Sequence, residues 1–499
     1  MTILHYILIA LEVILIFNLI IGVHELGHFL AARWCGLKVE RFAIWFGKPI
    51  WKKKVGGVEY ALGTIPFGGY VSLPQMATME MIEGKSGKLE EKVVEPFAER
   101  VGGEKGEAQA ALETLPNVSP FDKIIVAFAG PLFSFLLAIG FAVVVWSVGK
   151  PSIDADNTTT VGWVEPKDAN GNPGPAWQAG LRPGDTILEV DGQPVHHFSP
   201  TSADSVTWRI VTSTGTNIAI KYVRDGEEAT VYAVPFHLKT GWAERKSLRK
   251  ILIASASKAT IYEIATNSPA ARAGLQPGDE VVALNGEKIY SPDAVDYAQQ
   301  AMSNTIVKPL TLTVRRGGEQ FDRTLLPVKP LQPTNAFPLV GIMSWQGDTN
   351  ITLVHPSPLD QVSASAMQIF NTFGALFSKS EIGVQQLGGA VMILRVYSNL
   401  FQDEDGWRRV LWFSVILNVN LALLNLLPLP VLDGGHITLS LIEAVRRRPV
   451  SGKILEKIQS GFAALLIVFM LYIAFFDTGD WLRSARADRE QPVVFAPAK

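Results

Sequence analysis

The segment Leu19-Ile-Ile-Gly-Val-His-Glu-Leu-Gly-His-Phe-Leu-Ala-Ala-Arg33 carries His24, Glu25 and His28 inside an apolar run. On a helix, positions four residues apart share a face, so both imidazoles can reach one metal ion with Glu25 beside them. Zinc held in this way lowers the pKa of a bound water to about 7, and a glutamate can take its proton. Each charged residue costs on the order of 2.5–3.5 kcal/mol at a bilayer centre, which favours a functional metal site over an ordinary helix surface.

The composition favours a membrane protein with sizeable polar parts. The chain has 499 residues, of which 48% are hydrophobic and 18% are charged, and its mean hydropathy is +0.20. The length suits about three domains. A net charge of −2 gives no indication of nucleic-acid binding. The single cysteine, Cys35, excludes an internal disulfide, and we interpret it as a small apolar residue rather than a metal ligand.

Four stretches are apolar over about the 20 residues that a bilayer requires. The first, residues 1–34, lacks the basic start and the cleavage site of a signal peptide, so we interpret it as a retained membrane helix. The other three predicted spans are 121–149, 407–445 with a Pro-rich break, and 459–482.

The distribution of basic residues predicts how these spans are oriented. Lys and Arg gather after the first span and in the loop 446–458, which predicts that both loops are cytoplasmic. The long region 150–406 and the tail 483–499 then lie on the opposite side of the membrane.

Residues 35–120 form the predicted cytoplasmic loop. Within it, 58–74 combines β-branched and aromatic residues with glycines, which predicts a β-hairpin. Two interpretations remain open: an ordinary cytoplasmic hairpin, or one that re-enters the bilayer where protein covers its backbone. Residues 75–118 mix Glu, Lys, Gly and Ala, and predict an insert without a packed core.

The extracytoplasmic region contains an internal repeat. Ala179-Gly-Leu-Arg-Pro-Gly-Asp185 in one copy corresponds to Ala273-Gly-Leu-Gln-Pro-Gly-Asp279 in the other, each followed by a strand that ends in Asp-Gly or Asn-Gly. The copies, predicted as domains 157–240 and 250–331, resemble PDZ domains, which accept an extended peptide at a sheet edge. They either bind peptides or serve as a size filter or spacer. After them, the linker 332–406 predicts helices, either at the membrane surface or buried in a soluble part.

A catalytic zinc takes three protein ligands and a water. Of the other histidines, only His5 and His436 lie near apolar stretches. Asp433 is the better candidate, because it follows a Pro-rich break in the third span, where an uncompensated carboxylate is costly. The alternative is that Asp433 caps the second half of that span, and one carboxylate can fill both roles. Asn425, about two turns earlier, could donate to a developing oxyanion or to a substrate carbonyl.

Taken together, these motifs resemble the site-2 protease family, and most closely its bacterial regulator-of-sigma-E-protease branch. The motifs are His24-Glu-Leu-Gly-His28, Phe67-Gly-Gly-Tyr70, the paired repeats, and Asn425-Leu-Leu-Pro-Leu-Pro-Val-Leu-Asp433-Gly. They occur in the family's order over nearly the whole chain. The resemblance implies a zinc-dependent intramembrane endopeptidase. Its expected residues are the zinc ligands His24, His28 and Asp433, the general base Glu25, and the substrate-binding residues Asn425, Gly68, Gly69 and Tyr70.

The resemblance also implies a fold and partners. The expected fold is a multi-pass α-helical membrane protein with four transmembrane helices, a membrane-re-entrant β-hairpin and two α+β PDZ-like extracytoplasmic domains. The expected substrate is a single-span membrane protein in the lipid bilayer: an anti-sigma factor already shortened outside, or a remnant signal peptide. The expected location is a bacterial inner membrane with the PDZ pair in the periplasm. The chain departs from the family at Ser134, where Asn is common, and at Gly388-Gly389, where Gly-Pro is common.

Two other function classes are weighed against the protease. A membrane scaffold would use the PDZ pair to gather peptides and would keep a vestigial metal site, yet a purely structural site needs no base such as Glu25. A metal transporter would need polar residues along the second and fourth spans, which offer little beyond Ser134 and Ser147.

Overall fold

The computed structural model describes residues 3–76, 118–168, 170–199, 202–302, 306–333, 336–346, 352–402, 405–447, 452–487 and 493–497. Most of the predicted insert 75–118 therefore lies outside the described residues. The chain divides into two compact units. Unit 1 comprises Met1–Lys150, His355–Ile369 and Gly388–Asp477, and unit 2 comprises Pro151–Val354, Phe370–Leu387 and Thr478–Lys499.

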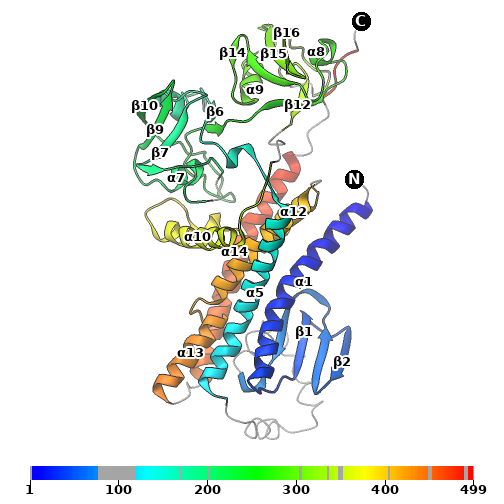
Figure 1. Ribbon diagram of the computed structural model, residues 1–499, viewed down its shortest axis with the longest axis vertical. Coiled ribbons are helices and arrows are strands. Elements are labelled where there is room, and N and C mark those ends of the chain that lie inside the picture. The colour runs from blue at the N-terminus through cyan, green and yellow to red at the C-terminus, as the bar shows by residue number, and fades with distance from the viewer. Residues whose placement is uncertain are drawn as a thin grey trace. The chain divides into compact units, whose positions relative to one another are not determined.

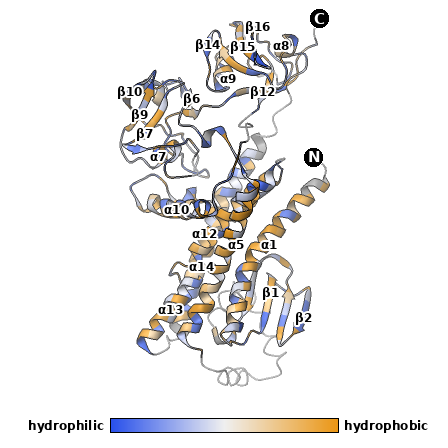
Figure 2. Cartoon of the chain, in the orientation of Figure 1, coloured by the Kyte–Doolittle hydropathy of each residue, from blue (hydrophilic) through white to orange (hydrophobic). Residues whose placement is uncertain are grey.

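Within the described residues, four helices are long and apolar enough to cross a membrane, as the sequence predicts. They are α1 (Ile3–Trp34), α5 (Pro120–Val148), α12 (Gly406–Asn425) and α14 (Gly452–Ala487). Hydrophobic residues run along α1 and α5 (Figure 2). The third predicted span, 407–445, is two helices, because prolines between α12 and α13 (Asp433–Arg446) interrupt the hydrogen-bond ladder.

Helix α5 organises unit 1 by packing against α1, α12 and α13 (Figure 1). Small residues make the contact with α12 close, since Ala138 and Ala142 are fully buried against Val415 and Val419. An ion pair of 3.0 Å joins Lys123 of α5 to Glu443 of α13. Helix α11 (Ala390–Gln402) also belongs to this unit and packs against α12 and α1.

The loop after α1 forms a four-stranded sheet rather than a hairpin confined to 58–74. Its strands lie in the order β2-β3-β1-β4. The bounds are β1 (Arg41–Phe46), β2 (Trp51–Val55), β3 (Val58–Leu62) and β4 (Ile65–Ser72). The predicted pairing is wrong, because β3 and β4 do not pair with each other: β1 lies between them, parallel to β3 and antiparallel to β4. The tight hairpin is β2–β3, where Gly56 and Gly57 supply the positive φ angles of a two-residue turn.

In unit 2, the two sequence copies fold with the same order of elements. The first copy contains β6 (Val161–Val164), α6 (Pro175–Ala179), β7 (Thr186–Val190), β8 (Gln193–Pro194), α7 (Val206–Thr212), β9 (Ile218–Arg224), β10 (Glu227–Ala233) and β11 (Ile253–Ser255). The second contains β12 (Ala259–Ile264), α8 (Pro269–Arg272), β13 (Glu280–Leu284), β14 (Glu287–Lys288), α9 (Asp293–Gln300), β15 (Leu310–Arg316), β16 (Glu319–Leu325) and β17 (Ile342–Trp345). Their identity as PDZ domains stays a prediction.

Each copy extends beyond its predicted boundary. Strand β11 pairs with β6, and Ile251 before it is buried in the first core, so the first copy does not end at residue 240. Strand β17 pairs with β12, and Val340 is buried in the second core, so the second copy does not end at residue 331. Both closing strands lie well after the last hairpin in sequence, and only tertiary pairing reveals them.

The remaining elements connect these parts. Strand β5 (Lys150–Ser152) pairs with β18 (Thr352–Val354). Helix α10 (Pro358–Phe377) and α11 fall in the linker 332–406, where helices are predicted. Whether these helices lie on a membrane surface stays a prediction.

In both copies the aspartate of Pro-Gly-Asp is buried and forms an ion pair with an arginine. Asp185 pairs with Arg224 at 2.7 Å, and Asp279 pairs with Arg316 at 2.6 Å; each carboxylate side chain is 1% exposed. Burial alone would raise the pKa of the Asp279 carboxyl, but the hydrogen bonds from Arg316 and from the Gln276 amide outweigh it and lower that pKa. The pair therefore stabilises the folded protein fully at pH values above 3.8, the ordinary pKa of this carboxyl. This stabilisation is lost as the pH falls through the lower pKa that the carboxyl has in the folded state.

Replacing Arg316 by Met should destabilise the second repeat, because the buried Asp279 carboxylate loses its charged donor. The measurement is amide hydrogen exchange across β13 and β15 in the purified full-length chain. The matched control is Arg315→Met on the same strand, whose partner Glu280 is 23% exposed and keeps more contact with water than Asp279 does, so this variant should destabilise the repeat less. Equal acceleration in both variants would contradict a special role for the buried pair.

Candidate metal centre

Three side chains from distant parts of unit 1 meet in one buried group. The Nε2 atoms of His24 and His28 are 3.2 Å apart. The Asp433 carboxylate oxygens lie 3.3 Å from Nε2 of His24 and 3.5 Å from Nε2 of His28. The exposed fractions are 8%, 1% and 7% for His24, His28 and Asp433. The structure therefore brings together the three predicted ligands.

Helix α5 holds both imidazole rings by their other nitrogen. His28 Nδ1 lies 2.8 Å from the backbone carbonyl of Val126, so it must be the donor. His24 Nδ1 lies 3.0 Å from the Ser134 hydroxyl. These contacts leave Nε2 of each ring facing the Asp433 carboxylate, as is usual where histidines hold a metal.

The rings can occupy this space only because α1 and α5 approach each other at glycines. A methyl group on Gly130 would lie 2.2 Å from His28 Nε2. A methyl group on Gly27 would lie 2.4 Å from the Ala129 carbonyl oxygen. Close packing at small residues is typical of membrane helices, and here it also makes room for the imidazole of a candidate ligand.

The donor set fits zinc. Two imidazole nitrogens and one carboxylate oxygen lie within 4.8 Å of one another, and they match the three protein ligands of catalytic zinc sites. Asp433 is the first residue of α13, whose N-cap residue is Leu432. Its carboxylate faces the histidines, which supports the ligand interpretation over that of a helix cap alone. His436 is buried on α13 but is not a member of the group, and the side chain of His5 lies outside the described residues.

Glu25 is buried beside this group, with 6% of its surface exposed. Its Oε2 atom has no hydrogen-bond partner among the described residues. Strand β4 runs against it, since a methyl group on Gly69 would lie 3.2 Å from Glu25 Cγ. A carboxylate oxygen without a partner, next to three candidate ligands and a strand, is placed to accept a proton from a reacting group.

The other predicted substrate-binding residues lie on or near this strand. Gly68 has a φ of 81° and is covered by the Phe46 ring, which leaves no room for a side chain. Tyr70 stacks on Phe46 and accepts a hydrogen bond of 3.0 Å from Arg41. Asn425 is the last residue of α12 and is half-buried, and its role stays a prediction.

Two contacts near the site were missed from the sequence. The sequence marks Ser134 as a departure from the family pattern and as a polar residue of the second span, but its contact with His24 is visible only in the fold. The Trp45 indole N–H donates to the Asn18 side-chain oxygen, which ties β1 to α1. Trp45 has a φ of 71° at the irregularity in β1. A lone Asn in the apolar run of the first span was the available signal.

Comparisons with known proteins agree over nearly the full length. Residues 12–469 match peptidase family M50. A Vibrio cholerae protein named "Putative zinc metalloprotease" is 30% identical over 462 residues, covering 89% of this chain and 92% of the relative. The "Regulator of sigma E protease" of Haemophilus influenzae is 27% identical over 480 residues, covering 92% and 96%. The "Regulator of sigma-E protease RseP" of Salmonella typhimurium is 25% identical over 490 residues, covering 93% and 96%.

Replacing Ser134 by Ala should lower zinc affinity by about 10- to 100-fold, because His24 loses the partner that orients its ring. Competition with a calibrated chelator on the purified protein measures this affinity without reference to activity. Ser147→Ala is the matched control, since Ser147 lies on the same helix but is exposed. Unchanged affinity in Ser134→Ala would show that the contact does not position the ring.

Proposed function

Because the chain belongs to peptidase family M50, the family of the site-2 proteases, and is therefore a membrane zinc metalloprotease, we propose that it cuts single-span membrane proteins within the bilayer. The observation that carries this proposal is the buried group of His24, His28 and Asp433 with Glu25 beside it. Three of these residues lie on α1, one of the four helices long and apolar enough to span a membrane.

His24, His28 and Asp433 would hold the zinc ion. When bound there, zinc supplies a Lewis acid that activates water and polarises the carbonyl of the scissile bond. Glu25 takes the proton from the attacking water and then delivers it to the leaving amine. Its unpartnered oxygen suits this role, because no competing hydrogen bond has to be broken. Asn425 is proposed to hold a substrate carbonyl from the end of α12.

Strand β4 is proposed to hold the substrate in an extended form. A peptide bond inside a helix is inaccessible to the site, so the substrate must unwind locally. Strand β4 is an outer strand of the sheet, and Gly69 on it lies beside Glu25. An outer strand can pair with an added segment through main-chain hydrogen bonds, which bind backbone whatever the side chains are. Gly68, Gly69 and Tyr70 would then face the substrate near the bond that is cut.

The names of the relatives support a proposal about the substrate class. Two of them are named as regulators of sigma-E, so we propose an anti-sigma factor as substrate, shortened beforehand on its extracytoplasmic side. Remnant signal peptides are a second candidate class. The proposed location is a bacterial inner membrane with the two repeats in the periplasm. There the repeats would either bind peptides or exclude intact substrates by bulk.

Replacing Glu25 by Gln should leave zinc content unchanged and reduce cleavage at least 10²-fold, because the proton acceptor is removed while the ligands remain. The measurement is cleavage of a tagged single-span substrate by pure protein in detergent, with zinc analysis of the same samples. Glu12→Gln is the matched control, since Glu12 is exposed on the same helix. Persistent cleavage by pure Glu25→Gln protein would remove Glu25 from the mechanism.

Replacing Asp433 by Ala should lower zinc affinity by more than the 10- to 100-fold that is typical when a residue that only orients a ligand is replaced, because a direct ligand is lost. His436→Ala is the discriminating variant, because His436 is the other histidine near this apolar segment. It should retain stoichiometric zinc. Zinc loss in His436→Ala, with normal zinc in Asp433→Ala, would reassign the third ligand.

A further inference from the structure

The end of the chain pairs with the second repeat. Val494 accepts a hydrogen bond of 2.7 Å from the Leu331 amide, and its own amide donates to the Gln332 carbonyl at 3.0 Å. Val494 and Gln332 form an antiparallel bridge. Leu331 and Gln332 follow β16 in sequence, so the tail pairs with neither edge strand of the sheet, β16 or β17. Residues 493–497 thus pair with the second repeat through a single β-bridge at Val494.

The Phe495 side chain anchors this tail. Phe495 is 3% exposed, while Val494 is 42% exposed. The Phe495 ring lies against Gly341, where an added methyl group would come within 3.2 Å of it and within 2.2 Å of Ser268. Gly341 has a φ of 86°, so both its backbone and its neighbours favour glycine. An aromatic ring buried at a glycine, beside main-chain pairing, is the arrangement of a bound peptide.

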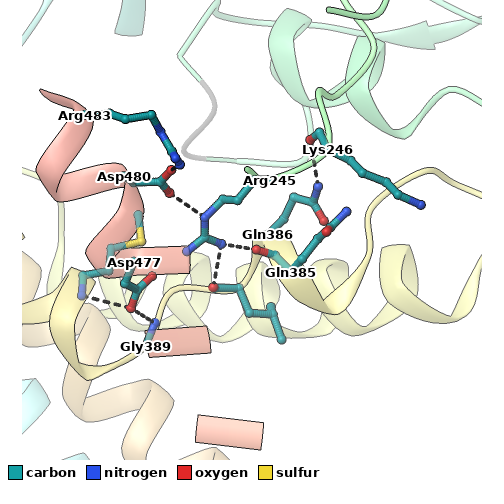
Figure 3. A network of polar contacts seen from close by, with 10 residues as sticks. Arg245, Lys246, Gln385, Gln386, Gly389, Asp477, Asp480 and Arg483 are labelled. Atoms are coloured by element: carbon teal, nitrogen blue, oxygen red, sulfur yellow. Dashed lines mark hydrogen bonds and ion pairs between the residues drawn. The ribbon is translucent and has the colours of Figure 1, made fainter. Parts of the chain in front are cut away.

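The segment before the tail is fixed to the same unit. Arg245 donates to Asp480 near the end of α14 at 2.6 Å and to the Leu387 carbonyl at 3.0 Å. Asp480 also accepts from Arg483 (Figure 3). Only five residues separate the end of α14 at Ala487 from Val493. The tail therefore has one anchored end close in sequence to the residues that dock.

We propose that the second repeat carries a binding site for an extended peptide with an aromatic side chain, and that residues 493–497 of the same chain occupy it as an exchangeable internal ligand. The site consists of the Leu331–Gln332 main chain and the position at Gly341 against which the Phe495 ring lies. Its natural competitor is an extended segment with an aromatic residue at the matching position. This inference concerns peptide binding alone and does not depend on the proposed cleavage reaction.

Because the tail belongs to the same chain as its site, one buried side chain is sufficient to keep it bound there. A short link gives an effective concentration in the millimolar range, so a tail with an intrinsic dissociation constant of roughly 0.1 mM would be bound about ten times as often as it is free. A peptide added from outside should then bind the intact chain about ten-fold more weakly than a chain whose site is empty. The site is closed in the resting protein and opens to a competitor that is tight or abundant.

The test uses a fluorescent peptide with the sequence of residues 488–499 and the purified full-length protein. Fluorescence polarisation should show about ten-fold tighter binding to the Phe495→Ala protein than to wild type, because the internal anchor is lost. Val494→Ala is the matched control and should bind like wild type, since that side chain is exposed. A peptide carrying Phe495→Ala should bind none of the three proteins measurably.

A second measurement reads the tail directly. Exchange of the Leu331 amide should accelerate in Phe495→Ala and in a chain ending at Ala487, but not in Val494→Ala. Equal peptide affinity for wild type and Phe495→Ala, or unchanged exchange at Leu331, would overturn the proposal. The proposal would also be overturned if the peptide failed to bind the Phe495→Ala protein. That measurement does not require the chain ending at Ala487 to fold.

Discussion

The approach of α1 to α5 at Gly27 and Gly130 is the constraint on which the candidate metal centre depends. Without a side chain at Gly130, the His28 imidazole fits between the helices. The same helix then supplies the Val126 carbonyl and the Ser134 hydroxyl that fix both rings. Asp433 arrives from α13, which also packs on α5. Helix α5 contributes none of the three candidate ligands, yet it determines where they can meet.

Burial of these charged side chains among apolar helices makes them chemically useful, but it also costs free energy. A carboxylate held among apolar helices without compensation would cost several kcal/mol, so Asp433 and Glu25 need partners or a function. Asp433 has two imidazoles facing it, while Glu25 keeps an oxygen without a partner among the described residues. The asymmetry separates their proposed roles: one carboxylate completes a ligand set, and the other stays available for a proton. The Trp45 indole donates a hydrogen bond to Asn18, which ties the sheet that contains the strand beside Glu25 to the helix that carries both histidines.

Local patterns predicted what depends on neighbouring residues in sequence. The four-residue spacing of the histidines, the apolar spans and the repeated Pro-Gly-Asp turns were all readable, because each reflects one helix, one bilayer thickness or one turn. Strand pairing was not: β1 lies between β3 and β4, and no local pattern in 58–74 signals a third strand. The closing strands β11 and β17 and the Ser134 contact were missed for the same reason. Each depends on a partner far away in sequence.

The two repeats show how these polar parts remain folded without disulfides. Each has a small core closed by a strand from later in the chain, and each adds a buried Asp–Arg pair at the same turn. A small fold closed by a late segment leaves main-chain groups available after its last hairpin. In the second repeat, the segment after β16 has such groups, and Val494 pairs with them. The geometry that closes the repeat thus also creates the site that the end of the chain occupies.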